Sequence, residues 1–320
     1  MILMPYLLEL IVFLIVLFLY IHINYHISTS SEPEVYEYNE TSKEQLEEMC
    51  NLKQPVIISR NILDINLNKL PLNDVYKDND LSIRDTLEDG TDKLLYLPLN
   101  YTKSNILFNK DTNNQYYSEH NEEFIKDTGL IKIFQNRDKF FRPPLHSNCF
   151  YDIIMGSDNS RTPLRYEINY RNYIYASNGN CKIKLVAPEH MNNLHPIMDY
   201  VNFEFRSSIN AWNVQDEFRN DFKRIKTIDI TLYEGQTLFI PAYWFYSIEL
   251  NKDTRLISFK YRNYFNIVSI LPFLGMHYLQ IHNIKKDKYK KISFDEHITE
   301  NKEDTLDKEN IKIEIDEKKE

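Results

Sequence analysis

The chain has 320 residues and a formal net charge of −9, with 42% hydrophobic and 27% charged residues. This balance is typical of a globular protein that buries a core, and the acidic charge argues against nucleic acid bound through a basic surface. Only six glycines occur, and no two of them lie within five residues of each other. That spacing excludes the glycine-rich loops of the usual Rossmann and P-loop nucleotide sites.

The first element is an apolar segment from 2 to 23, whose only charge is Glu9. As a helix at about 1.5 Å per residue, it reaches the roughly 30 Å thickness of a bilayer's hydrocarbon core. No Lys or Arg precedes it and no small-residue cleavage site follows it, as a secretory signal peptide would require. The sequence therefore predicts a single-pass membrane protein with a transmembrane anchor over residues 1–24. A cleaved signal peptide is the competing interpretation.

Residues 25–50 follow as a polar, acidic stalk that ends in a short helix. This helix is predicted to begin after Ser42, with Gln45 at the position that completes a capping box. Residues 55–59 form a short β-type run. Residues 64–140 mix short apolar runs with polar loops, and the sequence does not order their elements.

Strand signals are densest between 150 and 263. In the run 181–185, apolar residues alternate with Lys182 and Lys184, so apolar and charged side chains occupy opposite faces. Further short strands, separated by turn residues, are predicted at 228–232, 237–240 and 256–259. Several short strands with turns between them indicate a sandwich or jelly roll.

Two segments follow this β-rich region. Residues 264–284 are apolar but interrupted by Pro272 and Gly275, which predicts a packed helical segment rather than a second membrane span. Residues 285–320 contain 22 charged residues among 36 and are predicted to be a disordered tail, because they cannot bury a core. The lysine-rich start of the tail is a candidate contact with an anionic surface, and a solvated tail is the simpler interpretation.

Two stretches carry the functional signal. The first contains Thr162-Pro-Leu-Arg-Tyr-Glu167, then Asn172 and Gly179. The second reads Gly235-Gln-Thr-Leu-Phe-Ile-Pro-Ala-Tyr-Trp244 and continues through Tyr246. Together they resemble the cupin-like branch of the JmjC family, the asparaginyl-hydroxylase type of Fe(II)/2-oxoglutarate oxygenase. The resemblance covers residues 51–263 and defines the predicted main domain.

The resemblance implies a mainly β fold, a double-stranded β-helix or jelly roll with flanking helices, preceded by the transmembrane helix. Such a barrel holds iron with two histidines and one carboxylate and leaves positions open for oxygen and 2-oxoglutarate. Placed on the family motif, the first histidine is Arg165, the carboxylate is Glu167 and the distal histidine is Tyr246. The family-equivalent positions of the cofactor pocket are Thr162, Asn172 and Cys181.

These replacements predict that no metal binds. Arginine stays protonated in proteins and offers no lone pair to a metal. Residues 165 and 167 are two apart on a strand, so their side chains share a face. We therefore expect the Arg165 guanidinium to occupy the metal position and to pair with Glu167, with the Tyr246 hydroxyl as a further partner. Cys181 replaces the lysine that binds 2-oxoglutarate in the family.

Three alternatives remain open for this site. The pair at 165 and 167 becomes an exposed cross-strand pair if the strand register slips by one residue. A metal site rebuilt from Glu167 and histidines is a second alternative. Lys260, on the last predicted strand, is a candidate cation in place of the missing lysine. The histidines available for a rebuilt site are His146, His190 and His195.

The residues therefore predict a membrane-anchored, catalytically inactive protein, a pseudoenzyme that serves as a binding or scaffold module with no metal and no cofactor. Its expected partners are the membrane, through the N-terminal helix, and a protein ligand or a second copy of the chain, but no nucleic acid. The alternative is an Fe(II)/2-oxoglutarate-dependent protein hydroxylase with an unusual ligand set. A purely structural membrane protein is the third interpretation.

Overall fold

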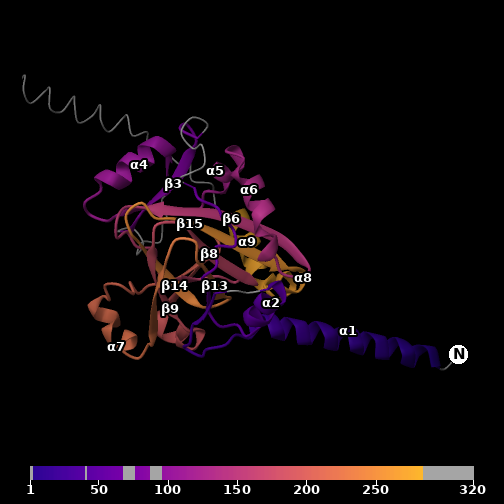
Figure 1. Cartoon of the computed structure of the whole chain (residues 1–320). Coiled ribbons are helices and arrows are strands. Elements are labelled where there is room, and N and C mark those ends of the chain that lie inside the picture. The colour runs from indigo at the N-terminus through magenta and orange to yellow at the C-terminus, as the bar shows by residue number, and fades with distance from the viewer. Residues whose placement is uncertain (1–2, 40–41, 68–75, 87–95, 284–320) are drawn as a thin grey trace, which may run out of the picture. The chain divides into compact units, whose positions relative to one another are not determined.

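Two facing β-sheets form the centre of the protein (Figure 1). The structure is a computed structural model and describes residues 3–39, 42–67, 76–86 and 96–283. The nine-stranded sheet A contains, in spatial order, β1 (Tyr36–Tyr38), β2 (Val56–Ile58), β13 (Thr237–Pro241), β8 (Arg171–Asn178), β15 (Arg255–Asn263), β6 (His146–Gly156), β5 (Tyr116–Ser118), β3 (Asp80–Asp85) and β4 (Leu97–Asn100). The six-stranded sheet B contains β10 (Pro196–Asp199), β11 (Glu204–Ser207), β7 (Arg165–Tyr166), β14 (Phe245–Leu250), β9 (Cys181–Val186) and β12 (Thr227–Leu232). The mainly β fold is confirmed.

Helices lie before, between and after the strands. The α-helices are α1 (Leu3–Ile27), α2 (Lys43–Asn51), α4 (Tyr101–Lys110), α5 (Glu122–Asp127), α6 (Leu130–Arg137), α7 (Arg219–Phe222), α8 (Tyr264–Ser269) and α9 (Leu271–Asn283). Short 3₁₀ turns occupy η2 (Asp138–Phe140), η3 (Pro188–Leu194) and η4 (Asp216–Phe218).

One apolar cluster fills the space between the two sheets. Ile174 and Leu238 contribute from sheet A, and Ile183 and Ile248 contribute from sheet B. In β9 the apolar residues are buried and Lys182 is exposed, so the alternation read from the sequence is confirmed. Each sheet therefore turns one apolar face toward the other, as expected for a sandwich with a shared core.

A second apolar cluster covers the outer face of sheet A. It joins Phe124 of α5 and Phe134 of α6 to Tyr151 of β6 and Phe259 of β15. The rings of Phe134 and Phe259 lie edge to face with centroids 6.0 Å apart, a favourable aromatic geometry. The unassigned region 64–140 therefore supplies the strands β3 to β5 at one edge of sheet A and helices that shield its outer surface.

The segment predicted as a stalk, residues 25–50, is more tightly bound to the domain than expected. Its short helix is α2, and the predicted capping box between Ser42 and Gln45 is confirmed. However, β1 pairs in parallel with β2 at the edge of sheet A. The indole nitrogen of Trp244 also donates a hydrogen bond to the Ser30 carbonyl at 3.0 Å. Backbone pairing of the segment with the sheet therefore replaces the free stalk that its polar composition suggested.

The two apolar terminal segments are both helical. In α1, the 22 residues Tyr6–Ile27 are long and apolar enough to cross a membrane, by length and composition. The predicted helical segment 264–284 is the pair α8 and α9, and Phe265 of α8 packs against α1. The predicted tail 285–320 lies outside the described residues.

Candidate functional site

The fold brings together the three residues at the family's metal positions. Arg165 of β7 and Tyr246 of β14 are direct partners in the antiparallel register. Glu167 follows β7, and its Oε1 accepts a hydrogen bond from the Tyr246 hydroxyl at 3.1 Å. Arg165 is only 5% exposed, so the alternative of a surface pair produced by a slipped register is wrong. These three side chains line one small cavity between the two sheets, which together we call the barrel.

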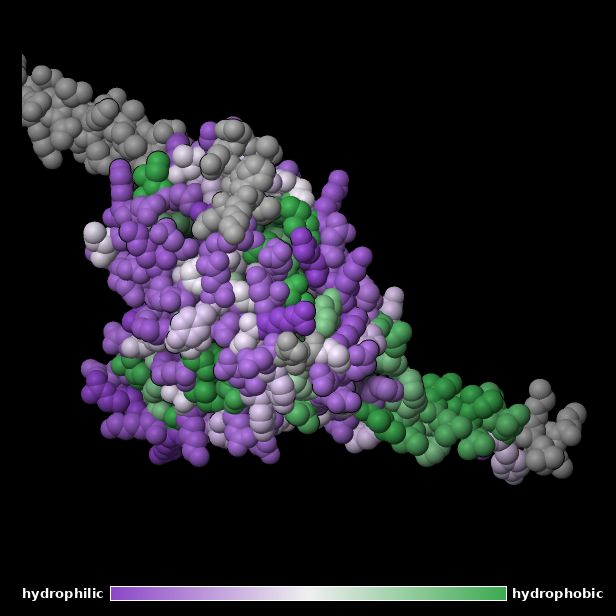
Figure 2. Space-filling model, in the orientation of Figure 1, coloured by the Kyte–Doolittle hydropathy of each residue, from purple (hydrophilic) through white to green (hydrophobic). Residues whose placement is uncertain are grey.

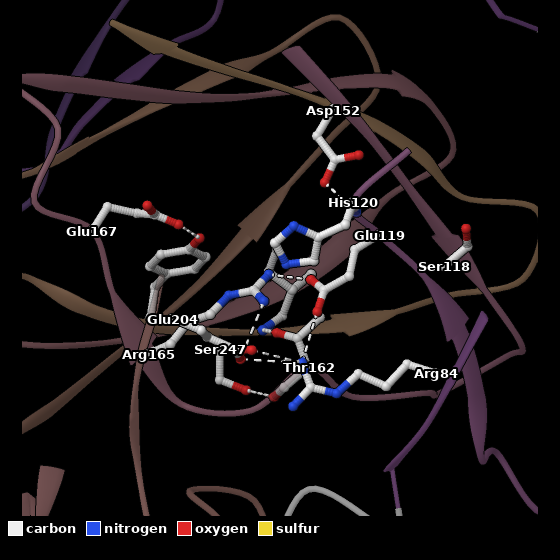
Figure 3. Close-up of polar contacts among 12 residues, drawn as sticks. Arg84, Ser118, Glu119, His120, Asp152, Thr162, Arg165, Glu167, Glu204 and Ser247 are labelled. Carbon is white, nitrogen blue, oxygen red and sulfur yellow. Dashed lines mark hydrogen bonds and ion pairs between the residues drawn. The ribbon is translucent and has the colours of Figure 1, made fainter. Parts of the chain in front are cut away.

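Arg165 has different ion-pair partners from the one expected. Its Nη2 lies 2.5 Å from Glu119 Oε2, and its Nη1 lies 3.8 Å from Glu204 Oε1. Arg84 Nη1 contacts the same two carboxylates at 2.9 and 3.1 Å. Figure 3 shows the two carboxylates lying between the guanidinium groups. The expected Arg165–Glu167 ion pair is therefore wrong, because Glu119 and Glu204 neutralise the arginine instead.

Glu167 is neutralised from the opposite sheet. Lys260 Nζ of β15 donates to its Oε1 at 2.7 Å, and the Asn169 side-chain amide donates to its Oε2 at 3.1 Å. Burial raises the pKa of Glu167, but the charges of Lys260 and Arg165 lower it more, so the pKa ends below its ordinary value. Lys260, a candidate cation from the sequence, is thus the direct partner of the family's carboxylate position.

Six side chains form a group whose charges compensate one another. We call this group the charged cluster, and it consists of Arg84, Glu119, Arg165, Glu167, Glu204 and Lys260. Burial acts against each charged form, but the ion-pair partners outweigh it. The pKa of Glu119 therefore lies well below its usual range, chiefly through Arg165, and the pKa of Arg165 lies well above its usual range, chiefly through Glu119. Three cations and three carboxylates are thus paired within one group.

The cavity that the charged cluster leaves open is only about 30 Å³ in volume. A cavity needs about 10–15 Å³ by this measure to hold one water molecule. The cavity therefore has room for one or two water molecules, and a dicarboxylate such as 2-oxoglutarate does not fit unless side chains move.

The residues at the three metal positions do not fit iron. Arg165 has no lone pair to donate, and Glu167 already accepts hydrogen bonds from Lys260 and Tyr246. Burial raises the pKa of Tyr246 to about 12, so its hydroxyl keeps its proton at neutral pH. Across residues 3–39, 42–67, 76–86 and 96–283, no group of three His, Cys, Asp or Glu side chains is arranged to hold a metal ion.

The histidines considered for a rebuilt metal site have other partners. His195 Nε2 lies 2.9 Å from Asp221 Oδ2 at a partly exposed position after η3. His190 Nε2 accepts a hydrogen bond from the backbone N–H of Lys226 at 3.4 Å. None of His146, His190 and His195 lines the cavity beside Glu167, so the fold does not assemble this alternative.

The family-equivalent cofactor positions do not line this cavity either. Thr162 accepts a hydrogen bond from the backbone N–H of Ile248 at 2.9 Å and so joins β14 to the segment before β7. The Asn172 amide donates to the Asn169 and Ile240 carbonyls at 3.3 and 3.2 Å. Cys181 lies in the apolar core between the sheets, where burial raises its pKa. All three have structural partners.

A larger cleft, of about 590 Å³, lies beside the barrel strands. Residues 161–164 before β7 line one part of it, and residues 207–215 after β11 line another. Most of the polar side chains there are amides and hydroxyls. The charged Arg161 is neutralised by Glu249 at 2.7 Å. The cleft therefore offers a neutral, hydrogen-bonding surface of a size that ligand sites commonly have.

Sequence motifs did not reveal half of the charged cluster. Arg84 and Glu119 come from region 64–140, which has no recognisable motif, and Glu204 comes from the short strand β11. All four residues of β11 are buried, although two of them are charged. Charged residues in a strand usually indicate a solvent-exposed face. Sequence spacing gives no sign that Glu204 lies opposite Arg84, so it could not identify this residue.

The comparisons with known proteins agree with this geometry. The chain matches the cupin-like domain family over residues 41–267. That stretch includes α2, sheet B, every strand of sheet A except β1, and the first part of α8. A comparison with curated proteins found no match. Since the match spans most of the chain and the two-sheet fold agrees with it, the chain belongs to the cupin-like domain family, which is associated with JmjC-type oxygenases.

Proposed function

We propose that the protein is a membrane-anchored, non-catalytic member of its family that acts as a binding or scaffold module. The observation that carries this proposal is the charged cluster. Arg165 and Lys260 bring fixed positive charge to the place where the family holds a metal cation, and the carboxylates there are already paired. Binding of a divalent cation would require these ion pairs to break in a buried site, at a large cost in free energy.

The 590 Å³ cleft supports a binding role for the same domain. Its amide and hydroxyl side chains suit a ligand rich in hydrogen-bonding groups, such as a peptide segment of a protein partner. The apolar helix α1 supports the anchor, because no residue in its apolar 18-residue stretch is buried against the domain.

Metal binding is the direct test of the non-catalytic part. The full chain, purified anaerobically in detergent, is measured for bound iron and manganese and for thermal stabilisation by Mn(II) with 2-oxoglutarate. We expect no stoichiometric metal and no shift in Tm. A ligand present at about 100 times its Kd would add roughly 2.7 kcal/mol of stability, so even weak binding is visible at high concentration. One metal per chain with a 2-oxoglutarate-dependent shift would instead favour the hydroxylase.

The anchor is tested by the mass and location of the mature chain. We expect the intact N-terminal segment to be retained and the protein to stay with membranes after alkaline carbonate extraction. A mature chain that lacks α1 and is found in the soluble fraction would show that the segment is a cleaved signal peptide.

A further inference from the structure

Helices α8 and α9 expose an apolar surface next to α1. The segment Tyr264–Asn283 contains no Asp, Glu, Lys or Arg. One side of it packs on the barrel, where the rings of Phe273 and Phe205 lie 5.4 Å apart between centroids. The other side, which we call the α9 face, exposes the large apolar residues Leu271, Met276, Tyr278 and Leu279.

Helix α8, which leads into α9, contacts the apolar surface of α1. Phe265 of α8 packs against Phe18 and His22 of α1, with ring centroids 5.6 and 4.2 Å apart. Figure 2 shows the apolar surface of α1 reaching the domain, and α8 lies at that junction in Figure 1. A membrane that surrounds the exposed part of α1 therefore approaches α8 as well.

The position of this contact along α1 sets the level of the membrane surface. Phe18 lies about two and a half turns before the end of the helix. The last turns are occupied by the domain: His26 is buried, and the Tyr25 hydroxyl donates to Asn51 at 2.9 Å. Only the part of α1 before Tyr25 is free to enter hydrocarbon, so the membrane–water interface lies within about two turns of the α8 contact at Phe18.

We propose that the α9 face lies on the bilayer surface as a second, interfacial membrane contact beside α1. This inference rests on the anchor in the proposed function. A helix with exposed apolar side chains at this level buries them at the boundary between headgroups and acyl chains. Tyr264 and Tyr278, 62% and 63% exposed, are suited to that boundary because tyrosine pairs an apolar ring with a polar hydroxyl.

Charge complementarity favours a bilayer as the occupant of this surface. Five lysines follow α9 in the sequence, at positions 285, 286, 288, 290 and 291, against one acidic residue, Asp287. Lysines next to an interfacial helix are attracted to anionic headgroups.

The test places an environment-sensitive label on each side of the domain in the full chain. Cys149 is replaced by Ser, because Cys50 and Cys181 are buried while Cys149 is partly accessible. One variant then carries Leu279→Cys and the matched control carries Tyr233→Cys, at positions 56% and 57% exposed. Each is labelled with the fluorophore NBD and reconstituted into vesicles of phosphatidylcholine and phosphatidylserine, with or without lipids that bear a nitroxide near the headgroup.

We expect the nitroxide lipids to quench the label at 279 at least twofold and to leave the label at 233 nearly unchanged. A second labelled variant, Tyr278→Cys, should respond as position 279 does. Equal and weak quenching at 279 and 233, in protein that floats with the vesicles, would overturn the inference and leave the anchor intact. A blue shift at 279 that grows with protein concentration, without quenching, would assign the face to a second copy. Failure of the chain to float with vesicles would overturn the anchor itself.

Discussion

Two neighbouring regions of the barrel differ in what they keep of the family pattern. The scaffold turn between β13 and β14 keeps Trp244, and the turn before β13 keeps Gly235. Gly235 has φ of +86°, and a Cβ there would lie 3.3 Å from Asn61, so the backbone favours glycine. Trp244 is fully buried. The metal position, one strand away, has lost both histidines. The scaffold residues therefore follow the family pattern, whereas the residues at the expected metal positions do not.

The charged cluster shows how the metal position is filled in this chain. In the family a cation holds the side chains of facing strands together. Here Lys260 of sheet A reaches Glu167 beside sheet B, and Arg84 of sheet A reaches Glu204 of sheet B. Ion pairs between the sheets thus cross-link the facing strands at the position that the family resemblance assigns to a metal.

The scaffold turn is expected to give the largest loss of stability. Trp244→Ala removes a large buried side chain and its hydrogen bond to the Ser30 carbonyl, at a cost of about 4 kcal/mol. Urea unfolding followed by circular dichroism measures this cost. Trp212→Ala is the matched control, because Trp212 is only partly buried and should cost less than half as much. Equal losses at both positions would contradict a special role for the turn.

The charged cluster is expected to respond nearly as strongly. Arg165→Met leaves the buried carboxylates of Glu119 and Glu204 with one cation fewer, and breaking a buried pair costs about 3 kcal/mol. Arg161→Met is the control, since Arg161 is 41% exposed in its pair with Glu249 and should cost at most about 1 kcal/mol. The measurement is the free energy of unfolding in urea at pH 7.

A second substitution distinguishes lost charge balance from lost packing. Arg165→Met combined with Glu119→Gln removes one charge of each sign, so we expect the double variant to be more stable than Arg165→Met alone. If Glu119→Gln adds a further loss instead, packing of the arginine stem rather than neutralisation holds the cluster together.

Acid should weaken the cluster gradually. The pKa values of Glu119 and Glu167 are lowered in the folded protein. Their stabilisation is complete above the unfolded value of about 4.3 and is lost as the pH falls from there toward the folded pKa. Burial raises the pKa of Asp152, so that group acts in the opposite sense. Unfolding free energies from pH 7 to pH 3 should fall less steeply in Arg165→Met, because Glu119 then loses its main partner.

Restoring the histidines should recover metal binding only weakly. Arg165→His with Tyr246→His supplies two donors next to Glu167, but Lys260 still holds that carboxylate. Adding Lys260→Met should tighten Mn(II) binding at least tenfold over the double variant, measured by titration calorimetry. Equal binding by the two variants would show that Lys260 does not block the site, and no binding by either would contradict the assignment of the metal position.

Sequence patterns predicted the parts of the protein whose signals are local. The apolar run of α1, the cap at Ser42 and the alternation in β9 each lie within one segment. The cluster could not be predicted in the same way, because its partners come from segments far apart in the chain. The sequence placed Arg165 beside Tyr246 and Glu167, but its ion-pair partner Glu119 belongs to a region without motif or periodicity. Long-range electrostatic pairing leaves little trace in a single sequence.

The edge strand β1 couples helix α1 to the barrel. It pairs in parallel with β2, and Lys53 Nζ donates to the Ser28 carbonyl at 2.7 Å just after α1. Hydrogen bonds that begin within a few residues of the helix end therefore transmit a displacement of α1 to sheet A. The helix and the barrel should therefore move as one rigid body, so that a change in the tilt of α1 in a membrane would also reorient the 590 Å³ cleft.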